Sequence, residues 1–217
     1  MNVVVGIASI PNREQTLKVT INSIYNQVDV IYLSLNGYNV VPEWIKNKDK
    51  IKAEILDNSL GDAAKFLHVN KSDKYFFSMD DDLIYPANYV KYMISGINKY
   101  KSIVTLHGRT YPKPFSSFKK WNGNYRCLNA VKNDVEADLG GTGVMAFDVN
   151  MFYPNIHIFQ YRNMADCFIA KEAFKQGVKI MVLKHKHGYI KQQKVPGSIW
   201  HSSNNKVKET NILKSFL

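Results

Sequence analysis

The sequence predicts an α/β domain with a largely parallel sheet, and three observations support this class. Short apolar runs alternate with segments of helical periodicity through the first half of the 217-residue chain. Hydrophobic residues make up 45% and charged residues 22%, which is the composition of a globular rather than a disordered chain. The length suits one domain with a substantial core. The two cysteines, Cys127 and Cys167, are too few for a disulfide scaffold and fit reduced thiols.

The first half predicts five strands with helices between them. The run at 3–8 is apolar throughout, as expected for a strand covered on both faces. After a break at 11–13, apolar side chains at helical spacing predict a helix over 14–27. Further strands are predicted at 30–35, 51–56, 75–79 and 103–106, with a short helix at 61–69 and a helix at 86–100 that has proline in its first turn.

The second half is less regular. Residues 108–140 mix proline, glycine, lysine and aromatic residues, which predicts long loops and short strands over an open site. A glycine-rich segment at 140–143 precedes an apolar run at 144–147. A helix at 163–176 and a strand at 178–183 follow, and from about Lys184 we expect a flexible basic tail.

The formal net charge of +11 admits an anionic membrane, nucleic acid or phosphate-bearing molecules as partners, and equally a solvated basic surface. The common nucleic-acid-binding motifs are absent, so we expect no nucleic-acid partner. No apolar run approaches the roughly 20 residues that span a bilayer. Residues 1–8 lack the basic segment and cleavage site of a signal peptide. We therefore expect a cytoplasmic protein.

Three adjacent aspartates, Asp80, Asp81 and Asp82, directly follow the strand at 75–79. Adjacent carboxylates repel one another and destabilise the end of a buried strand unless a cation neutralises them. Carboxylate oxygens suit Mg²⁺ or Mn²⁺, which also bind phosphate oxygens. Because alternate residues of an extended segment point the same way, Asp80 and Asp82 are the candidate metal ligands. A solvated acidic turn before the helix at 86–100 is the alternative.

Other polar residues follow the strands, and ligands bind beyond the carboxyl ends of parallel strands. Arg13 and Lys65 can contact a phosphate or base, or be surface cations. Asp62 can contact a ribose or base, or cap the helix after it. The full set of ligand-binding candidates is Ser9, Arg13, Asn36, Asp62, Lys65, Asp81, Gly141 and Thr142.

The order of these segments resembles the GT-A glycosyltransferases, particularly their large family 2. An apolar strand that ends in Asp-X-Asp is similar to the metal motif of that family. Residues 3–13 resemble its first strand and nucleotide-binding loop, residues 60–66 its donor-binding segment, and residues 140–143 its acceptor-side loop. Asp166 falls where the family carries an aspartate at the start of a helix. The resemblance spans about residues 1–185.

The resemblance implies a single GT-A catalytic domain over 1–217, with a mixed, mainly parallel sheet flanked by helices. Residues 1–107 would bind a nucleotide sugar and residues 108–217 the acceptor. The implied activity is metal-dependent transfer of a hexosyl group from a nucleoside-diphosphate sugar, for which we expect a UDP-sugar. The acceptor would be a glycan or a lipid-linked sugar, with peripheral contact to an anionic membrane.

The resemblance also implies residue roles. Asp80 and Asp82 would hold Mn²⁺ or Mg²⁺ on the diphosphate, and His201 is a candidate third ligand from the tail. Asp166 would be the base of an inverting transfer, with Glu172 and Asp138 as weaker candidates.

The chain also departs from the family pattern. Asn36 and Gly37 stand where the family usually has an acidic turn, and Ala165 stands where it often has glutamate. The signature of processive synthases is absent, so a single transfer is expected. Trp121 is a candidate acceptor contact, whereas His185 and His187 are assigned to the core or its rim.

Four other functions stay open. A retaining GT-A enzyme would need no Asp166 base. A nucleotidyltransferase shares the scaffold and the metal carboxylates, but residues 9–13 lack the glycines of its usual loop. A basic, non-enzymatic binding module and a glycoside hydrolase with paired carboxylates are the other two.

Overall fold

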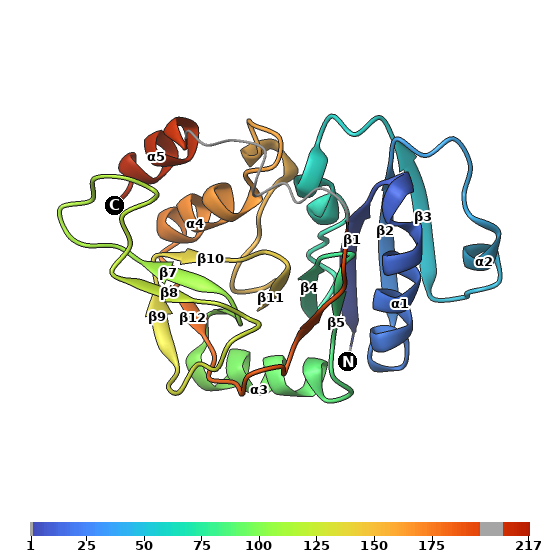
Figure 1. The fold of residues 1–217 in the computed structure, drawn as a ribbon, viewed down its shortest axis with the longest axis horizontal. Helices are drawn as coiled ribbons and strands as arrows, with labels where there is room; N and C mark the ends of the chain where they lie inside the picture. Colours follow the sequence, from blue (N-terminus) through green and yellow to red (C-terminus); the bar gives the residue numbers. More distant parts are fainter. Residues whose placement is uncertain (1, 196–205) are drawn as a thin grey trace.

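The structure, a computed structural model, describes residues 2–195 and 206–217. Its centre is an eight-stranded sheet of order β3-β2-β1-β4-β11-β6-β12-β9 (Figure 1). The strands β3, β2, β1 and β4 are mutually parallel, as are β6 and β12, whereas β11 and β9 run antiparallel to their neighbours. The predicted mixed, mainly parallel α/β sheet is confirmed. Its strands are β1 (Val3–Ser9), β2 (Val30–Asn36), β3 (Ile51–Leu56), β4 (Tyr75–Met79), β6 (Ile103–Thr105), β9 (Val135–Ala137), β11 (Val144–Asp148) and β12 (Ile180–Val182).

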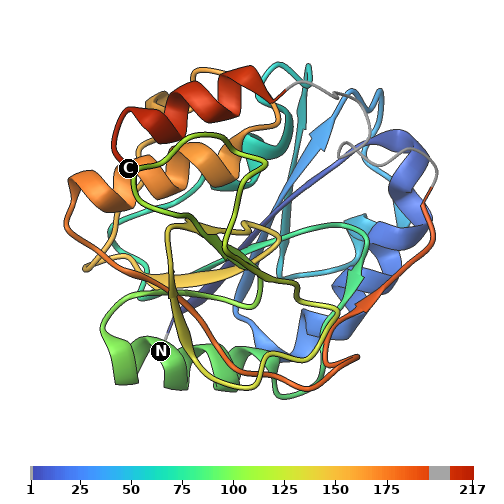
Figure 2. The ribbon, with the colours of Figure 1, turned by 60° about the vertical axis from the view of Figure 1, so that its left-hand side comes forward.

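Helices cover both faces of this sheet. The α-helices are α1 (Glu14–Ile24), α2 (Glu43–Lys46), α3 (Tyr89–Tyr100), α4 (Ala165–Lys175) and α5 (Val207–Lys214). Short 3₁₀ helices are η1 (Pro11–Arg13), η2 (Tyr25–Gln27), η3 (Gly61–Phe66) and η4 (Ile156–Ile158). The two α-helices α4 and α5 lie side by side, away from α1 and α3 (Figures 1 and 2).

The central strands β1 and β4 are apolar except for Ser9 and Ser78, because they face two hydrophobic cores. Val5 and Phe77 point into a core that α1 and α3 cover. Their neighbours Val4 and Phe76 point into a second core beneath η3, α4 and α5. Since successive side chains of a strand point to opposite faces, burial on both sides leaves no polar alternation.

Two small sheets complete the fold. One has the order β10-β7-β8, made of β7 (Gly108–Thr110), β8 (Gly123–Tyr125) and β10 (Leu139–Gly140). The other pairs β5 (Leu83–Ile84) with β13 (Lys191–Gln192). The segment 111–122 between β7 and β8 runs near α5 in both views (Figures 1 and 2).

The C-terminal tail contains structure that its sequence did not predict. Residues 191–192 form β13, and α5 buries Ile212 and Leu213 in the second core. The candidate metal ligand His201 lies outside the described residues. Among the helices of the described ranges, none has the length and apolar character needed to cross a bilayer.

Candidate functional site

The polar residues that follow β1, β2 and β4 meet at one edge of the sheet. The three strands are adjacent and parallel, so their carboxyl ends point the same way. Ser9 lies in register with Leu35, and Ile7 with Met79, which places the aspartates after β4 beside the end of β1. Ligands bind at this edge in open α/β sheets.

Asp81 is buried and holds the loop after β1 in place through two hydrogen bonds. Its two oxygens accept hydrogen bonds from Ser9 Oγ at 2.6 Å and from Arg13 Nη1 at 2.9 Å. Burial raises the pKa of Asp81, and the hydrogen bonds from Ser9 and Arg13 oppose this shift. Ser9, Arg13 and Asp81 are therefore brought together as predicted, but Asp81 is engaged within the protein rather than directed at a ligand.

Asp80 forms an ion pair with a buried lysine of η3. Lys65 Nζ lies 2.5 Å from Asp80 Oδ1, and the lysine side chain is only 3% exposed against 45% for the aspartate. Although burial disfavours the charged amine, the charges of Asp80 and Asp62 raise the pKa of Lys65 above its usual value. A fixed cation therefore stands beside the more accessible of the two candidate metal ligands.

Asp82 shares this negative cluster. Its Oδ2 lies 3.6 Å from Arg13 Nη1. Burial, and then the charges of Asp80 and Asp81, raise the pKa of Asp82 to about 6.

The donor set fits a divalent cation that is completed by substrate. In residues 2–195 and 206–217 no group of three or more His, Cys, Asp or Glu side chains is arranged to hold a metal ion. Mg²⁺ and Mn²⁺ are commonly held by one or two carboxylates together with phosphate oxygens and waters. Asp80 and Asp82 supply such a pair of carboxylates, and the remaining ligands would come from a diphosphate and solvent.

Asp62 connects η3 to the start of α4. Its Oδ2 accepts a hydrogen bond from the backbone N–H of Ala165 at 3.2 Å, so it caps α4 and not the helix that follows it in the sequence. Burial raises the pKa of Asp62 to about 6, with a further contribution from Asp166, while Lys65 opposes the shift. Close by, Asn36 Nδ2 donates to the carbonyl of Gly61 at 2.9 Å, which ties the end of β2 to the same helix.

Asp166 is held by the glycine-rich segment. Its Oδ1 accepts two hydrogen bonds from Thr142, one from the backbone N–H at 2.8 Å and one from Oγ1 at 2.7 Å. Gly143, the next residue, lies against Asp80: a Cβ there would be 2.0 Å from Asp80 Oδ2. The short segment 142–143 therefore spans from the candidate base to the candidate metal ligand.

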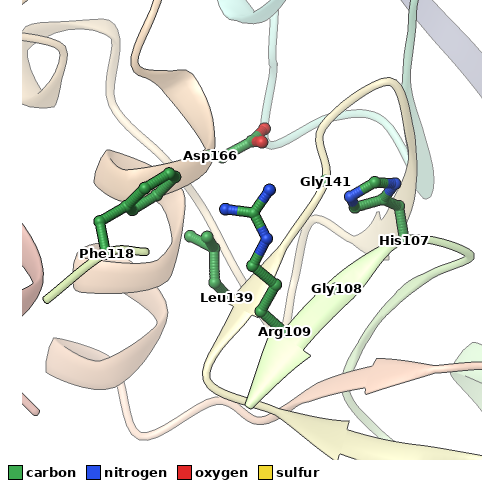
Figure 3. Close-up of a pocket in the computed structure, with 7 residues that line it drawn as sticks. All are labelled: His107, Gly108, Arg109, Phe118, Leu139, Gly141 and Asp166. Atoms are coloured by element: carbon green, nitrogen blue, oxygen red, sulfur yellow. The ribbon is translucent and has the colours of Figure 1, made fainter. Parts of the chain in front are cut away.

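A cavity of about 30 Å³ opens beside Asp166, enough for about one water-sized group. Figure 3 shows the Asp166 carboxylate above the guanidinium of Arg109, with His107 across the space. The lining residues are His107, Gly108, Arg109, Phe118, Leu139, Gly141 and Asp166.

His107 and Arg109 were not among the predicted site residues. Burial lowers the pKa of His107, while the Asp166 charge opposes the shift, so the imidazole is neutral near pH 7. The guanidinium of Arg109 lies 4.8 Å from the Phe118 ring and 4.9 Å from the Trp121 ring. Their position just beyond the strand at 103–106 was the available signal, because the same strand-end argument that selected the aspartates applies to them.

The remaining candidates have structural partners elsewhere. Asp138 Oδ2 accepts a hydrogen bond from the backbone of Tyr111 at 2.7 Å. Glu172 accepts one from Gln176 within the last turn of α4. The buried His185 contacts the carbonyl of Leu183 through Nδ1 at 2.8 Å, in agreement with a core position.

Two solved structures share the fold at low sequence identity. The structure of S. aureus TarS residues 1–349 in complex with UDP-GlcNAc superposes with a TM-score of 0.55 at 14% identity, over 94% of this chain and 62% of that one. The 4-diphosphocytidyl-2C-methyl-D-erythritol synthase of Anaerococcus prevotii gives a TM-score of 0.52 at 10% identity, over 99% and 97%. No protein-family model and no curated protein sequence matches the chain.

The fold is therefore GT-A-like, a Rossmann-like α/β architecture, as the sequence resemblance implied. The chain spans less than two thirds of the TarS structure that it matches. At these identities the similarities establish the fold, and the activity has to be argued from the site.

Proposed function

We propose that this protein is a glycosyltransferase that moves a sugar from a nucleoside-diphosphate sugar to a hydroxyl group of a glycan or lipid-linked acceptor. One observation carries the proposal. Asp80, one of the two carboxylates suited to a cation, lies against Gly143, and a third carboxylate, Asp166, accepts a hydrogen bond from the preceding residue Thr142 and lines a small cavity. A donor diphosphate and an acceptor hydroxyl need these two kinds of group at neighbouring positions.

We assign the binding site of the nucleotide-sugar donor to the edge of the sheet beyond the carboxyl ends of β1 and β4. Asp80 and Asp82 would hold Mn²⁺ or Mg²⁺, which when bound stabilises the negative charge that develops on the diphosphate leaving group. Lys65 keeps Asp80 in place through its 2.5 Å ion pair. Arg13, fixed by Asp81, places a second positive charge at this edge. The complex of the TarS structure with UDP-GlcNAc supports a UDP-sugar as the donor.

We assign the binding site of the acceptor hydroxyl to the cavity beside Asp166. Two hydrogen bonds from Thr142 fix its Oδ1. In an inverting transfer the acceptor oxygen bonds to the anomeric carbon as the bond from that carbon to the diphosphate breaks. The Asp166 carboxylate takes the hydroxyl proton. The neutral His107 and the cation Arg109 line the same cavity and would orient the acceptor. The net charge of +11 supports contact with an anionic membrane surface that presents a lipid-linked acceptor.

A nucleotidyltransferase is the second candidate, and the similarity to the Anaerococcus prevotii synthase favours it. The two activities leave different products. A glycosyltransferase releases a nucleoside diphosphate, whereas a nucleotidyltransferase releases pyrophosphate. Residues 9–13 contain no glycine, and Ser9 and Arg13 bind Asp81, which counts against a phosphate-cradling loop at this position.

A product assay decides between them. The protein with Mn²⁺ is incubated either with UDP-GlcNAc and a mixture of glycan acceptors, so that the sugar passes to an acceptor hydroxyl or to water, or with CTP and a sugar phosphate. UDP and pyrophosphate are measured separately. We expect UDP release that is lost in Asp82→Asn, while Asp29→Asn, a change at the opposite end of the sheet, leaves it intact. Pyrophosphate release from CTP, or no product under either condition, would count against the glycosyltransferase.

A further inference from the structure

The positive charge of the chain is concentrated in its second half. Residues 108–217 contain 17 of the 29 lysine and arginine residues but 7 of the 18 acidic residues. Within this half, the segments 126–132 and 184–194 together hold six basic residues and no aspartate or glutamate. Because no acidic residue of the same segments offsets this charge, the two segments favour an anionic partner.

The two segments lie side by side. Val131 and His185 form an antiparallel bridge, in which the backbone N–H of each residue donates to the carbonyl of the other at 2.9 Å. Both residues are buried, so their chain neighbours Lys132, Lys184 and Lys186 point outward. Like charges on paired segments repel one another, and a bound anion would relieve this repulsion.

The cations of these segments have no carboxylate partners. All six side chains are exposed, and none lies within ion-pair distance of a carboxylate in the ranges 2–195 and 206–217. Asp134 accepts a hydrogen bond from the backbone N–H of Lys184 at 2.7 Å, but its carboxylate is already paired with Lys99 at 3.0 Å. We call the six residues the basic strip: Arg126, Lys132, Lys184, Lys186, Lys191 and Lys194.

One end of the basic strip reaches the candidate metal ligands. The segment 184–194, coloured orange to red, runs past α3 toward β5 (Figures 1 and 2). Lys191 lies in β13, which pairs with β5 directly after the aspartates. The backbone N–H of Gln193 donates to the carbonyl of Asp82 at 2.8 Å, so Lys194 is one residue away from a contact with the site.

The other segment brings the basic strip close to the cavity beside Asp166. His185 Nε2 contacts the carbonyl of Arg126 at 3.4 Å, which holds Arg126 against the segment 184–194. Burial lowers the pKa of His107, and the charge of Arg126 contributes to this shift. Since His107 lines that cavity, Arg126 acts electrostatically on the place assigned to the acceptor.

The basic strip has no exposed apolar anchor. The large hydrophobic side chains that are exposed in the described ranges all lie on other segments: Val19, Val40, Ile55, Trp121, Tyr161, Phe174 and Val207. Elements that lie on a membrane surface usually combine basic residues with apolar or aromatic side chains that enter the headgroup region. A row of cations without such side chains fits a linear polyanion better than a bilayer.

We propose that the basic strip binds an acceptor glycan with repeated anionic groups, phosphates or carboxylates, and holds it beside the site. The inference rests on the proposed function and adds the chemical class of its acceptor. Ammonium and guanidinium groups bind both kinds of anion through charge-assisted hydrogen bonds.

Binding of sodium polyphosphate and of polygalacturonate tests the basic strip by calorimetry at low salt without divalent cations, with dextran as a neutral polymer. We expect both anionic polymers to bind and dextran not to bind, and the tighter of the two identifies the preferred anion. The triple variant Lys132→Gln, Lys184→Gln, Lys186→Gln should weaken binding about tenfold, because three exposed charge contacts are lost.

A second triple variant is the matched control. Lys113→Gln, Lys120→Gln, Lys214→Gln removes the same charge from exposed lysines of the segment 111–122 and of α5. We expect it to change the Kd of either polymer less than about twofold. An equal loss of affinity in the two triple variants would show that net charge alone attracts the polymer and would overturn the proposal.

Two other results would also overturn it: dextran bound as tightly as the anionic polymers, or binding to phosphatidylglycerol vesicles through the basic strip with no binding of either polymer. Binding of UDP-GlcNAc with Mn²⁺ is measured on separate portions of the same samples. Its absence in the unmodified protein would count against the proposed function, whereas its presence with equal polymer binding by both variants would refute the basic strip alone.

Discussion

Gly143 is the position where one added carbon should disturb the candidate metal ligands most directly. In Gly143→Ala the new Cβ would lie 2.0 Å from Asp80 Oδ2, and ordinary van der Waals contact begins at 3.4 Å. The carboxylate must therefore withdraw by about the difference, 3.4 − 2.0 = 1.4 Å. Because Asp80 is also bound to Lys65 at 2.5 Å, the displacement strains that ion pair as well.

A misplacement of about 1 Å in an active site can reduce the rate roughly 100-fold. We expect a loss of that order in Mn²⁺-dependent turnover of UDP-GlcNAc, about 2.7 kcal/mol in transition-state stabilisation. UDP release at subsaturating donor measures it, and circular dichroism checks that the variant is folded.

Gly96→Ala is the matched control. Its Cβ would meet Leu183 Cδ1 at 2.5 Å, a comparable clash in α3 away from the aspartates. We expect it to change thermal stability without changing turnover per folded molecule. If Gly143→Ala turned over UDP-GlcNAc as fast as Gly96→Ala, the position assigned to Asp80 in the reaction would be wrong.

Three further predictions address the base, the buried cation and the pH dependence. Asp166→Asn should retain UDP-GlcNAc binding but lose about 10²- to 10⁴-fold in kcat, because it lacks the base. The control variant Glu172→Gln should keep its activity. Equal kcat values for the two variants in steady-state kinetics would exclude Asp166 as the base. Lys65→Met leaves two carboxylates without their buried cation and should lower the free energy of unfolding by about 2–4 kcal/mol in urea titrations; a change below about 1 kcal/mol would contradict this role. The pKa of Asp62 is raised from 3.8 to about 6, so its ionisation opposes folding. The free energy of unfolding should therefore rise as the pH falls from 7.5 to 5, by about 1.4 kcal/mol. In urea titrations at the two pH values, Asp62→Asn should reduce the increase in the free energy of unfolding. Part of the increase should remain, because the pKa of Asp82 is shifted in the same direction. An increase as large as in the unmodified protein would show that Asp62 is not the group responsible.

The sequence predicted the sheet well where burial alone determines structure. β4 has the predicted bounds, Tyr75–Met79, because a strand buried on both faces is mainly apolar and the aspartates end it. The rule that ligands bind beyond the carboxyl ends of parallel strands likewise predicted that Ser9, Asn36 and Asp80 lie at one edge of the sheet.

What the sequence could not predict depends on contacts between distant segments. Asp62 caps a helix that begins 103 residues later, so local spacing indicates only its own neighbourhood. The ion pair of Lys65 with Asp80 removes part of the repulsion that suggested an uncompensated metal site. Helix α5 is short and forms against the second core, so its helical pattern is weak in the sequence, while its burial of Ile212 and Leu213 is clear in the structure.

The central claim is that the aspartates after β4 hold a cation that in turn holds a diphosphate. Electron paramagnetic resonance of Mn²⁺ tests this directly, because the signal of free Mn²⁺ is lost on binding. We predict that the protein with UDP-GlcNAc removes the free signal, and that the double variant Asp80→Asn, Asp82→Asn with the same nucleotide sugar does not. An equal loss of the free signal in the double variant, or no loss with the unmodified protein, would contradict the claim.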